Sequence, residues 1–482
     1  MFKEYHPSKN LPFWFFTMSV LILLTVPTLI QDGMFLDAML YTCVSHNLSH
    51  GFGTFWFPQF SHSSFADFPV FLEHPPLVFG IQSLFFRLFG DSMYVERFYT
   101  FLTMCTTAFL INLLWRDLFK KEEEIKELSW LPILFWITIP GSIWSYSNNM
   151  MENSMAVFDL CAVILILRAA ESERTETGKL FLAGLFVFLA TFSKGVPGFF
   201  PVAIPFLHWL IFRKKSAGNI ILSTIILLSA PVIIYFIMLN FPQSKESLQY
   251  YVTKRLWVRI NDSPVVTNRF YILKNLFTEL IPQLLFLAII ITAAKIKKVK
   301  VPIISYSVRS VLFISIGLAA SVPLTFTFVQ RGFYLVPSLP FFAIGLSVLI
   351  ASRISDFKER VIGKKKVYRI FYILSIVLFF FSIGFSYSQK GKTQRDREML
   401  HDVHAIGDAI PGKSAITVNP DIANTSVLEC YFIRYYDISL YIDEPKEYLM
   451  VKKSMNPVIP TDFEKLNIAT NIYDIYKKKE NR

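Results

Sequence analysis

The sequence predicts a polytopic α-helical membrane protein that ends in a small soluble domain. Hydrophobic residues make up 53% of the 482 residues and 49 are Phe, a composition outside the range of soluble globular proteins. About eleven apolar segments approach or reach the length needed to cross a bilayer. The net charge of +12 comes from short basic clusters between these segments, which indicates membrane orientation and not nucleic-acid binding.

The order of the apolar segments gives the expected topology. The predicted spans are residues 13–30, 98–115, 131–148, 154–169, 180–193, 196–211, 219–240, 276–294, 303–328, 333–351 and 369–387. The first span lacks a small-x-small cleavage site, so we interpret it as a retained anchor. With a cytoplasmic N-terminus, the basic clusters all fall on the cytoplasmic side: Lys120–Lys121, Arg213–Lys215, Lys295–Lys300 and Lys364–Lys366.

Three long segments then lie on the opposite side: residues 31–97, 241–275 and 388–482. We divide the chain into a transmembrane domain, residues 1–387, and a C-terminal domain, residues 388–482. Turn sequences between short mixed segments predict an α/β or α+β fold for that tail. In the first outer segment, PPLVFGIQSLFFRLFG is too short to cross the bilayer and predicts a re-entrant or interfacial helix.

Charged side chains are expensive at a membrane span or its mouth, and six of them share the outer side. These residues are Asp32, Glu73, Arg97, Glu152, Lys194 and Arg331. Three acids and three bases at one membrane face can form a polar cavity for a charged ligand. We therefore expect the chemistry on that face.

Asp32 directly follows the first span in QDGMFLDAMLY, where Gly33 permits a tight turn. Its carboxylate could act as a general base for an acceptor hydroxyl or amine. The alternative is an Asp that caps the next helix. Asp37 is a weaker candidate for the same role.

The string FLEHPPL places Glu73 and His74 before two prolines, which stiffen the backbone. This corner could aim an acid and an imidazole at a ligand, or it could be a simple loop corner. A metal site is a weaker alternative because neighbouring positions supply too few ligands for a tetrahedral shell. The histidines His46, His50 and His62 are expected to be solvated.

Lys194 lies between two apolar segments, in FSKGVPGFFP. Its ammonium group could neutralise a phosphate, or it could extend to the membrane interface as lysines near helix ends often do. Arg331 and Tyr334 occur in QRGFYLVPSLP, where a guanidinium suits phosphate through its forked donors. Glu152 stands at another outer end, where helix capping is its alternative role. The loop 241–275 mixes aromatic and cationic residues that suit a sugar phosphate or lipid headgroups.

Taken in order, these motifs resemble the dolichyl/polyprenyl-phosphate-mannose–protein mannosyltransferase superfamily, which has the glycosyltransferase C fold. The similarity rests on the Asp after the first span, EHPPL, VERF, the acid after the third span, SKG-x-P-G and R-x-x-Y-x-x-P-x-x-P. It spans about residues 10–350 and is closest in kind to bacterial lipid A aminoarabinose transferases.

The resemblance implies an inverting transfer of a sugar from a polyprenyl-phosphate carrier, such as undecaprenyl phosphate, on the periplasmic face of a bacterial inner membrane. The implied catalytic residues are Asp32, as base or acceptor-binding carboxylate, and Glu152. The implied donor-site residues are Glu73, His74, Arg97, Lys194, Arg331 and Tyr334. The acceptor is left open among lipid A, another glycolipid, a polysaccharide and a protein.

The sequence departs from the pattern of the aminoarabinose transferases at two places. The aminoarabinose enzymes usually read Glu-Lys-Pro where this chain has Glu73-His74-Pro75, and they carry a histidine in the loop that corresponds to 241–275, which here has none. No cofactor is required by the pattern, and a divalent metal ion stays open, with Glu73 and His74 as weak candidate ligands.

Two other classes of protein stay open. A transporter or flippase of an anionic lipid-linked substrate would also need cations in a membrane cavity, although no matched halves are evident. A non-catalytic envelope assembly protein could use its tail to bind a partner.

Overall fold

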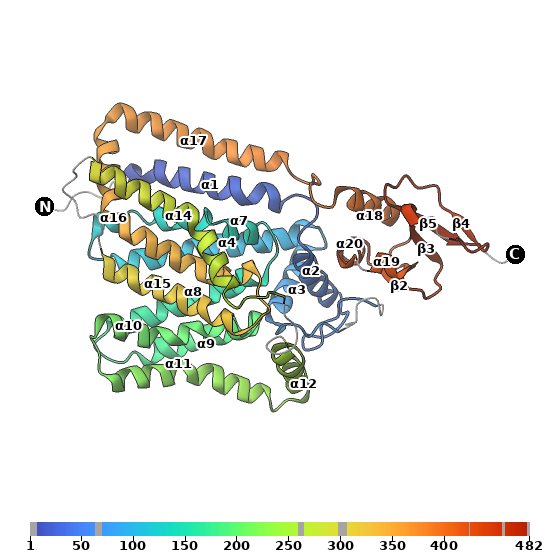
Figure 1. The fold of residues 1–482 in the computed structure, drawn as a ribbon, viewed down its shortest axis with the longest axis horizontal. Helices are drawn as coiled ribbons and strands as arrows, with labels where there is room; N and C mark the ends of the chain where they lie inside the picture. The colour runs from blue at the N-terminus through green and yellow to red at the C-terminus, as the bar shows by residue number, and fades with distance from the viewer. Residues whose placement is uncertain are drawn as a thin grey trace. The chain divides into compact units, whose positions relative to one another are not determined.

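The computed structural model describes residues 7–62, 70–258, 265–296, 306–423, 425–455 and 458–479. Arg259, in the loop 241–275, and most of the basic cluster after Lys295 lie outside these ranges. The chain forms two compact units (Figure 1). Unit 1 contains residues 1–28, 100–147 and 151–389, and unit 2 contains residues 29–99, 148–150 and 390–482.

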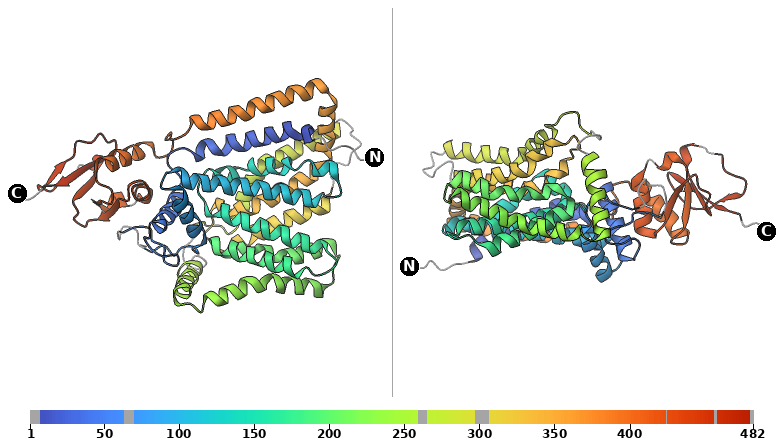
Figure 2. Two further views of the ribbon diagram at one scale, coloured as in Figure 1. Left: turned by 180° about the vertical axis from the view of Figure 1, so that it is seen from behind. Right: turned by 90° about the horizontal axis from the view of Figure 1, so that it is seen from below.

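Unit 1 is a bundle of helices that run side by side in both views of Figure 2. Its long helices are α1 (Leu11–Leu29), α4 (Tyr94–Leu118), α8 (Met151–Glu171), α9 (Thr177–Lys194), α11 (Ala217–Met238), α14 (Tyr271–Ile296), α15 (Ser307–Ser321), α16 (Leu339–Gly363) and α17 (Lys365–Ser388). Shorter helices are α5 (Glu123–Lys126), α6 (Trp130–Ile137), α7 (Pro140–Tyr146), α10 (Ile204–Phe212) and α12 (Pro242–Tyr250). Five further turns of 3₁₀ or π helix in the described residues are η1 (Pro7–Asn10), η2 (Val196–Ala203), η3 (Tyr251–Leu256), η4 (Val322–Phe326) and η5 (Gly332–Ser338).

Nine helices in the described ranges are long and apolar enough to cross a membrane, or ten if one bent pair counts as a span. The bent pair is Glu123–Ile137 with Pro140–Tyr146, at an angle of 82°. Its bend falls where Ile139 takes an extended conformation before Pro140, as expected for a residue that precedes proline.

The remaining segment of the eleven predicted spans is a shorter apolar helix, Val196–Phe212. Its first half is a 3₁₀ helix that contains Pro197 and Pro201, two residues that lack the backbone N–H an α-helix needs. The predicted polytopic helical fold is therefore confirmed, with nine or ten candidate spans in the part of the chain that the structure covers.

The basic connections gather at one end of unit 1. Lys358, near the end of α16, contacts both Asn10, at the start of α1, and Glu127, after α5, at 3.3 and 2.9 Å. Arg309, at the start of α15, pairs with Glu122 at 2.8 Å. Two more contacts link neighbouring helix ends. Lys120, after α4, pairs with Glu171 at the end of α8, and Lys215, after α10, donates to the Ala169 carbonyl of α8. The predicted grouping of these loops on one side is consistent with the contacts.

Unit 2 combines the first long connecting segment with the tail. The helices are α2 (Leu36–Ser49), α3 (Leu77–Phe89), α18 (Arg397–Ala409), α19 (Pro420–Ala423) and α20 (Ser426–Tyr436). Strands β1 (Ala415–Val418), β2 (Ser439–Ile442), β3 (Tyr448–Lys452), β4 (Phe463–Lys465) and β5 (Tyr473–Lys478) form a sheet in the order β2-β1-β3-β5-β4. β1 is parallel to β2 and β3, and β5 is antiparallel to β3 and β4. The predicted mixed α/β character of the tail is confirmed.

α3, the segment predicted as a short interfacial or re-entrant helix, has 13 residues and spans about 20 Å at the rise of an α-helix. This is shorter than a bilayer core. Leu84, Leu88 and Phe89 on it are exposed. An exposed apolar face on a helix too short to cross agrees with the interfacial interpretation.

One face of α20 packs on the segment that follows α1. Tyr431 donates to the Met34 carbonyl at 3.2 Å, and the Cys43 thiol donates to the Cys430 carbonyl at 3.1 Å. Arg434 pairs with the buried Glu96 at 2.9 Å. The tail and the first connecting segment therefore share one interior within unit 2.

Candidate functional site

Asp32 lies where the backbone leaves α1, in a short bridge to the start of the tail. Its N–H donates to the Lys392 carbonyl at 2.9 Å, and it forms an isolated parallel bridge with Thr393. Gly33 follows with φ of +80°, and a Cβ there would lie 2.8 Å from a Leu400 methyl group. Only glycine fits that conformation and that space, so the turn fixes where the Asp32 side chain points.

The Asp32 carboxylate is buried and accepts three hydrogen bonds. His404 Nε2 on α18 approaches Oδ2 at 2.7 Å, and the Tyr435 hydroxyl on α20 donates to Oδ1 at 2.8 Å. The Gly33 N–H also donates to Oδ1 at 2.8 Å. A carboxylate has about four lone-pair positions, so about one position remains for another donor.

These donors decide the charge of the site. Burial by itself would raise the pKa of Asp32, but hydrogen bonds from His404 and Tyr435, with the charges of His404 and Arg97, hold that pKa below its ordinary value. The hydrogen bond to Asp32 in turn raises the pKa of His404 against the opposing effect of burial. The cluster therefore favours an ionised aspartate beside a protonated imidazole.

Arg97, near the start of α4, uses its guanidinium to anchor the backbone before Asp32. Its Nε and Nη2 donate to the Gln31 carbonyl at 3.2 and 2.9 Å, and its Nη1 pairs with Glu96 at 2.8 Å. Glu96 also pairs with Arg434, so one buried carboxylate joins two guanidiniums. Arg97 was predicted at the donor, and in the structure its guanidinium contacts the Gln31 carbonyl and Glu96.

The Glu73–His74 corner lies at the beginning of α3, as its two prolines predicted. His74 is buried, and its Nε2 is 3.2 Å from the Tyr41 hydroxyl of α2. Glu73 is half-buried. Neither residue belongs to a group of three potential metal ligands in the described ranges.

Unit 1 brings together Glu152, in the first turn of α8, and Lys194, the last residue of α9. Lys194 Nζ lies 2.7 Å from Glu152 Oε1, and both side chains are almost completely buried. The Phe333 and Tyr334 rings, in η5, lie 5.5 and 5.8 Å from the same ammonium group. The structure therefore brings Glu152, Lys194 and Tyr334 together, three of the residues predicted for the site.

Gly195 lets another element approach this pair closely. It has φ of +100°, and a Cβ there would collide with the hydroxyl of Tyr251 in η3. Arg331, just before η5, is exposed.

His404 and Tyr435 were missed by the sequence analysis. Both belong to the tail, 372 and 403 residues from Asp32, so no local motif links them to it. The sequence contained one indication that this helix carries a polar contact face. Tyr431, Arg434 and Tyr435 in YFIRYY are spaced so that three polar-tipped side chains lie on one side of a helix. That face meets Met34, Glu96 and Asp32.

Known proteins resemble this chain both in sequence and in structure. Residues 73–240 match the family model described as Dolichyl-phosphate-mannose-protein mannosyltransferase. ArnT from Cupriavidus metallidurans bound to undecaprenyl phosphate has a similar structure, with a TM-score of 0.66, 12% sequence identity, and coverage of 96% of this chain and 97% of that chain. The structure of the same protein in the apo state matches with a TM-score of 0.63 and 11% sequence identity. That match covers 98% of this chain and 98% of that chain. A search of curated protein sequences finds no match.

The chain therefore shares its fold with ArnT over nearly its whole length, and residues 73–240 match the mannosyltransferase family model. Both findings agree with the fold that the motifs predicted.

The Asp32–His404 pair predicts a defined pH dependence of stability. The His404 contribution is fully present below the ordinary histidine pKa of about 6.5 and is lost as the pH rises through the raised folded-state value. The Asp32 contribution is present above about pH 3.9 and is lost as the pH falls through the lowered folded-state value. His404→Gln should therefore lower the unfolding temperature most between about pH 4 and 6.5, and less at higher pH.

Thermal unfolding of the detergent-solubilised chain from mildly acidic to alkaline pH measures this effect. The imidazole is 38% exposed, so we expect a contribution of about 1 kcal/mol or less. The double variant Asp32→Asn/His404→Gln is the control and should add no further pH dependence of this kind. An unchanged profile in His404→Gln would show that the pair contributes nothing to stability.

Proposed function

We propose that the chain transfers a sugar from a polyprenyl-phosphate carrier to an acceptor in the cell envelope. The observation that carries this proposal is a fold shared over nearly the whole chain with a protein that binds undecaprenyl phosphate. The mannosyltransferase family match to residues 73–240 supports the same class of reaction. Fold alone does not define chemistry, so the proposal also depends on the two polar clusters.

The reaction we propose is a single displacement at the anomeric carbon. An acceptor hydroxyl or amine forms a bond to that carbon while the bond from the carbon to the phosphate oxygen breaks. The polyprenyl phosphate leaves with the electron pair, and the acceptor loses its proton. One displacement inverts the configuration at the anomeric carbon.

Asp32 is the proposed partner of the acceptor nucleophile. Its low pKa makes it a weak base before reaction, but the carboxylate stays ionised and its orientation is fixed by three donors. The remaining lone-pair position can accept a hydrogen bond from the acceptor. The proton can then move to Asp32 as the new bond forms and the nucleophile becomes acidic.

Lys194 is the proposed contact for the donor phosphate, with Glu152 holding its ammonium group. A buried lysine ion-paired at 2.7 Å is held in one position. The exposed Arg331, which precedes the same 3₁₀ turn as Phe333 and Tyr334, can add a forked donor to a phosphate. Stabilisation of the phosphate charge as it leaves is the expected catalytic effect.

We further propose that Asp32 and the tail face the periplasm across a bacterial inner membrane. The support is the collection of basic connections and the start of α1 at one end of unit 1, which favours a cytoplasmic location for that end.

Asp32→Asn should lower the transfer rate by about 10² to 10⁴-fold, because the amide cannot take the proton of the acceptor. Mass spectrometry of lipid A, other envelope glycolipids and glycoproteins provides the measurement, with cells that lack the gene and cells that carry the variant. Cells that lack the gene and cells that carry the variant should lose the same sugar mass from their glycans. Asp421→Asn, an exposed carboxylate in the same unit, is the matched control and should retain it.

If all glycans are unchanged in cells that lack the gene, the proposal of a transferase is wrong. Transport of a lipid-linked substrate, or a role in envelope assembly, would then be the better interpretation. Full transfer by Asp32→Asn alone would disprove only the assignment of Asp32.

Lys194→Met combined with Glu152→Gln should weaken donor binding without leaving a buried charge unpaired. Loss of a charge-assisted hydrogen bond predicts an increase of about 10 to 100-fold in KM for the donor, with a smaller change in kcat. Steady-state kinetics with a polyprenyl-phosphate sugar provides the measurement. Lys179→Met, at the opposite end of α9, is the control and should leave KM unchanged.

A reporter enzyme fused after residue 388 tests the proposed orientation. A reporter that is active only in the periplasm should be active in this fusion and inactive when fused after residue 363, at the end of α16. The reverse result would place the tail and Asp32 in the cytoplasm.

A further inference from the structure

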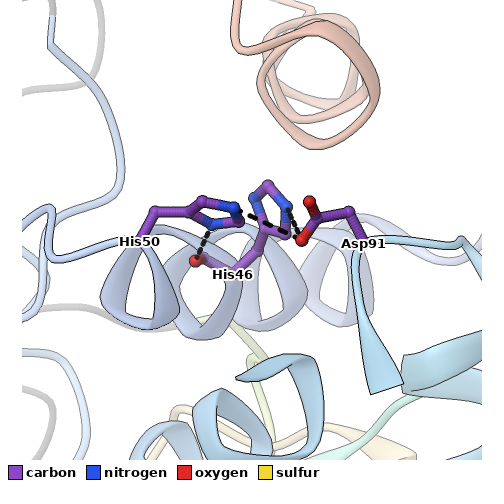
Figure 3. Close-up of side chains that lie close together, drawn as sticks. All are labelled: His46, His50 and Asp91. Atoms are coloured by element: carbon purple, nitrogen blue, oxygen red, sulfur yellow. Dashed lines mark hydrogen bonds and ion pairs between the residues drawn. The ribbon is translucent and has the colours of Figure 1, made fainter. Parts of the chain in front are cut away.

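Two histidines and an aspartate outside the clusters described above meet in unit 2 (Figure 3). His46 lies in the last turn of α2, and His50 caps the C-terminus of that helix one turn later. Asp91 lies between α3 and α4, directly after Gly90, whose φ of +82° turns the chain. Figure 3 shows both imidazoles on the same side of α2, pointing toward one carboxylate.

We propose that His46, His50 and Asp91 bind a divalent transition metal ion of the zinc type. Asp91 Oδ1 lies 3.5 Å from His46 Nε2 and 3.3 Å from His50 Nε2. A tetrahedral ion with ligand distances of about 2.0–2.1 Å has ligand–ligand edges of about 3.3–3.4 Å. These two separations are close to those edges, and all the candidate ligand atoms lie within 4.8 Å of one another.

The hydrogen bonds of His50 assign its protons. Its Nδ1 lies 3.0 Å from the His46 carbonyl oxygen and 3.1 Å from Ser49 Oγ. The Ser49 hydroxyl already donates to the same carbonyl at 2.6 Å, so both neighbours of Nδ1 are acceptors and Nδ1 carries a proton. Donation from the second ring nitrogen to a carbonyl is the usual arrangement of a metal-bound histidine, and it leaves Nε2 as the ligand.

The His46 side chain is buried, and its Nε2 is the ring nitrogen that faces Asp91. Its Nδ1 has no hydrogen-bond partner in the described ranges. A neutral imidazole is the form that binds a metal ion, and Nε2 is placed to be the ligand atom.

The surrounding charges permit a cation. Arg434 is a fixed positive charge near the cluster, and its Nη2 donates to the Asp91 carbonyl and to Glu96, at 3.1 and 2.9 Å. Glu96 therefore offsets its charge. The side chains of His50 and Asp91 are 47% and 62% exposed, which gives an ion a path from solvent.

Ligand chemistry defines the class of ion. Two imidazoles and a carboxylate favour Zn²⁺ and neighbouring transition metals over Mg²⁺ and Ca²⁺, which prefer oxygen ligands. Three protein ligands leave a fourth position for water or another ligand. Because His46 and His50 belong to α2 and Asp91 follows α3, a bound ion would also join these two helices.

The test uses the full chain in detergent, treated with a chelator and then titrated with Zn²⁺ or with Co²⁺ as a spectroscopic probe. We expect one ion per chain, a tetrahedral Co²⁺ spectrum, and a rise in unfolding temperature on addition of Zn²⁺. Since His46 is buried and its replacement could prevent folding, the variants are His50→Gln and Asp91→Asn. Each should weaken Zn²⁺ binding by at least about tenfold.

His401→Gln, which removes an exposed imidazole of α18, is the matched control and should bind Zn²⁺ like the unmodified chain. The proposal is overturned if the unmodified chain binds no stoichiometric Zn²⁺, or if both ligand variants bind it with unchanged affinity. Loss of binding in His401→Gln alone would place the ion elsewhere. These measurements do not depend on sugar transfer, so the proposal does not depend on the proposed function.

Discussion

A buried carboxylate stays ionised only if donors replace the water it has lost, and this constraint governs unit 2. Asp32 receives one donor from its own turn and two from the tail, His404 and Tyr435. These interactions fix both the charge and the direction of the carboxylate. The tail is therefore part of the candidate site, although Asp32 is separated from it by most of the chain.

The same constraint organises the neighbouring interior. Glu96 is buried between Arg97 and Arg434, so each charge has an opposite partner. Removal of one member of such a group typically costs about 3–5 kcal/mol, because it leaves an unpaired buried charge. Arg97 in turn holds the Gln31 carbonyl, and this positions the corner at which Asp32 begins.

In unit 1 the two charges expected at span ends satisfy each other. Glu152 and Lys194 would each be costly alone in an apolar bundle, and their separation of 2.7 Å removes much of that cost. A phosphate that approached Lys194 would compete with Glu152 for the ammonium group. Under the proposed function, this competition would set how tightly the phosphate is held.

The sequence by itself determined the membrane class, most of the spans, the mixed α/β tail and the fold, because composition, span length and short ordered motifs are local properties. It also singled out Asp32, Glu152 and Lys194 as candidate site residues, because charges near apolar spans are rare, and their roles stay predictions. Only the tertiary structure decided their partners. His404, Tyr435 and the His46–His50–Asp91 cluster depend on contacts between distant segments, and no local pattern records which distant side chains will meet.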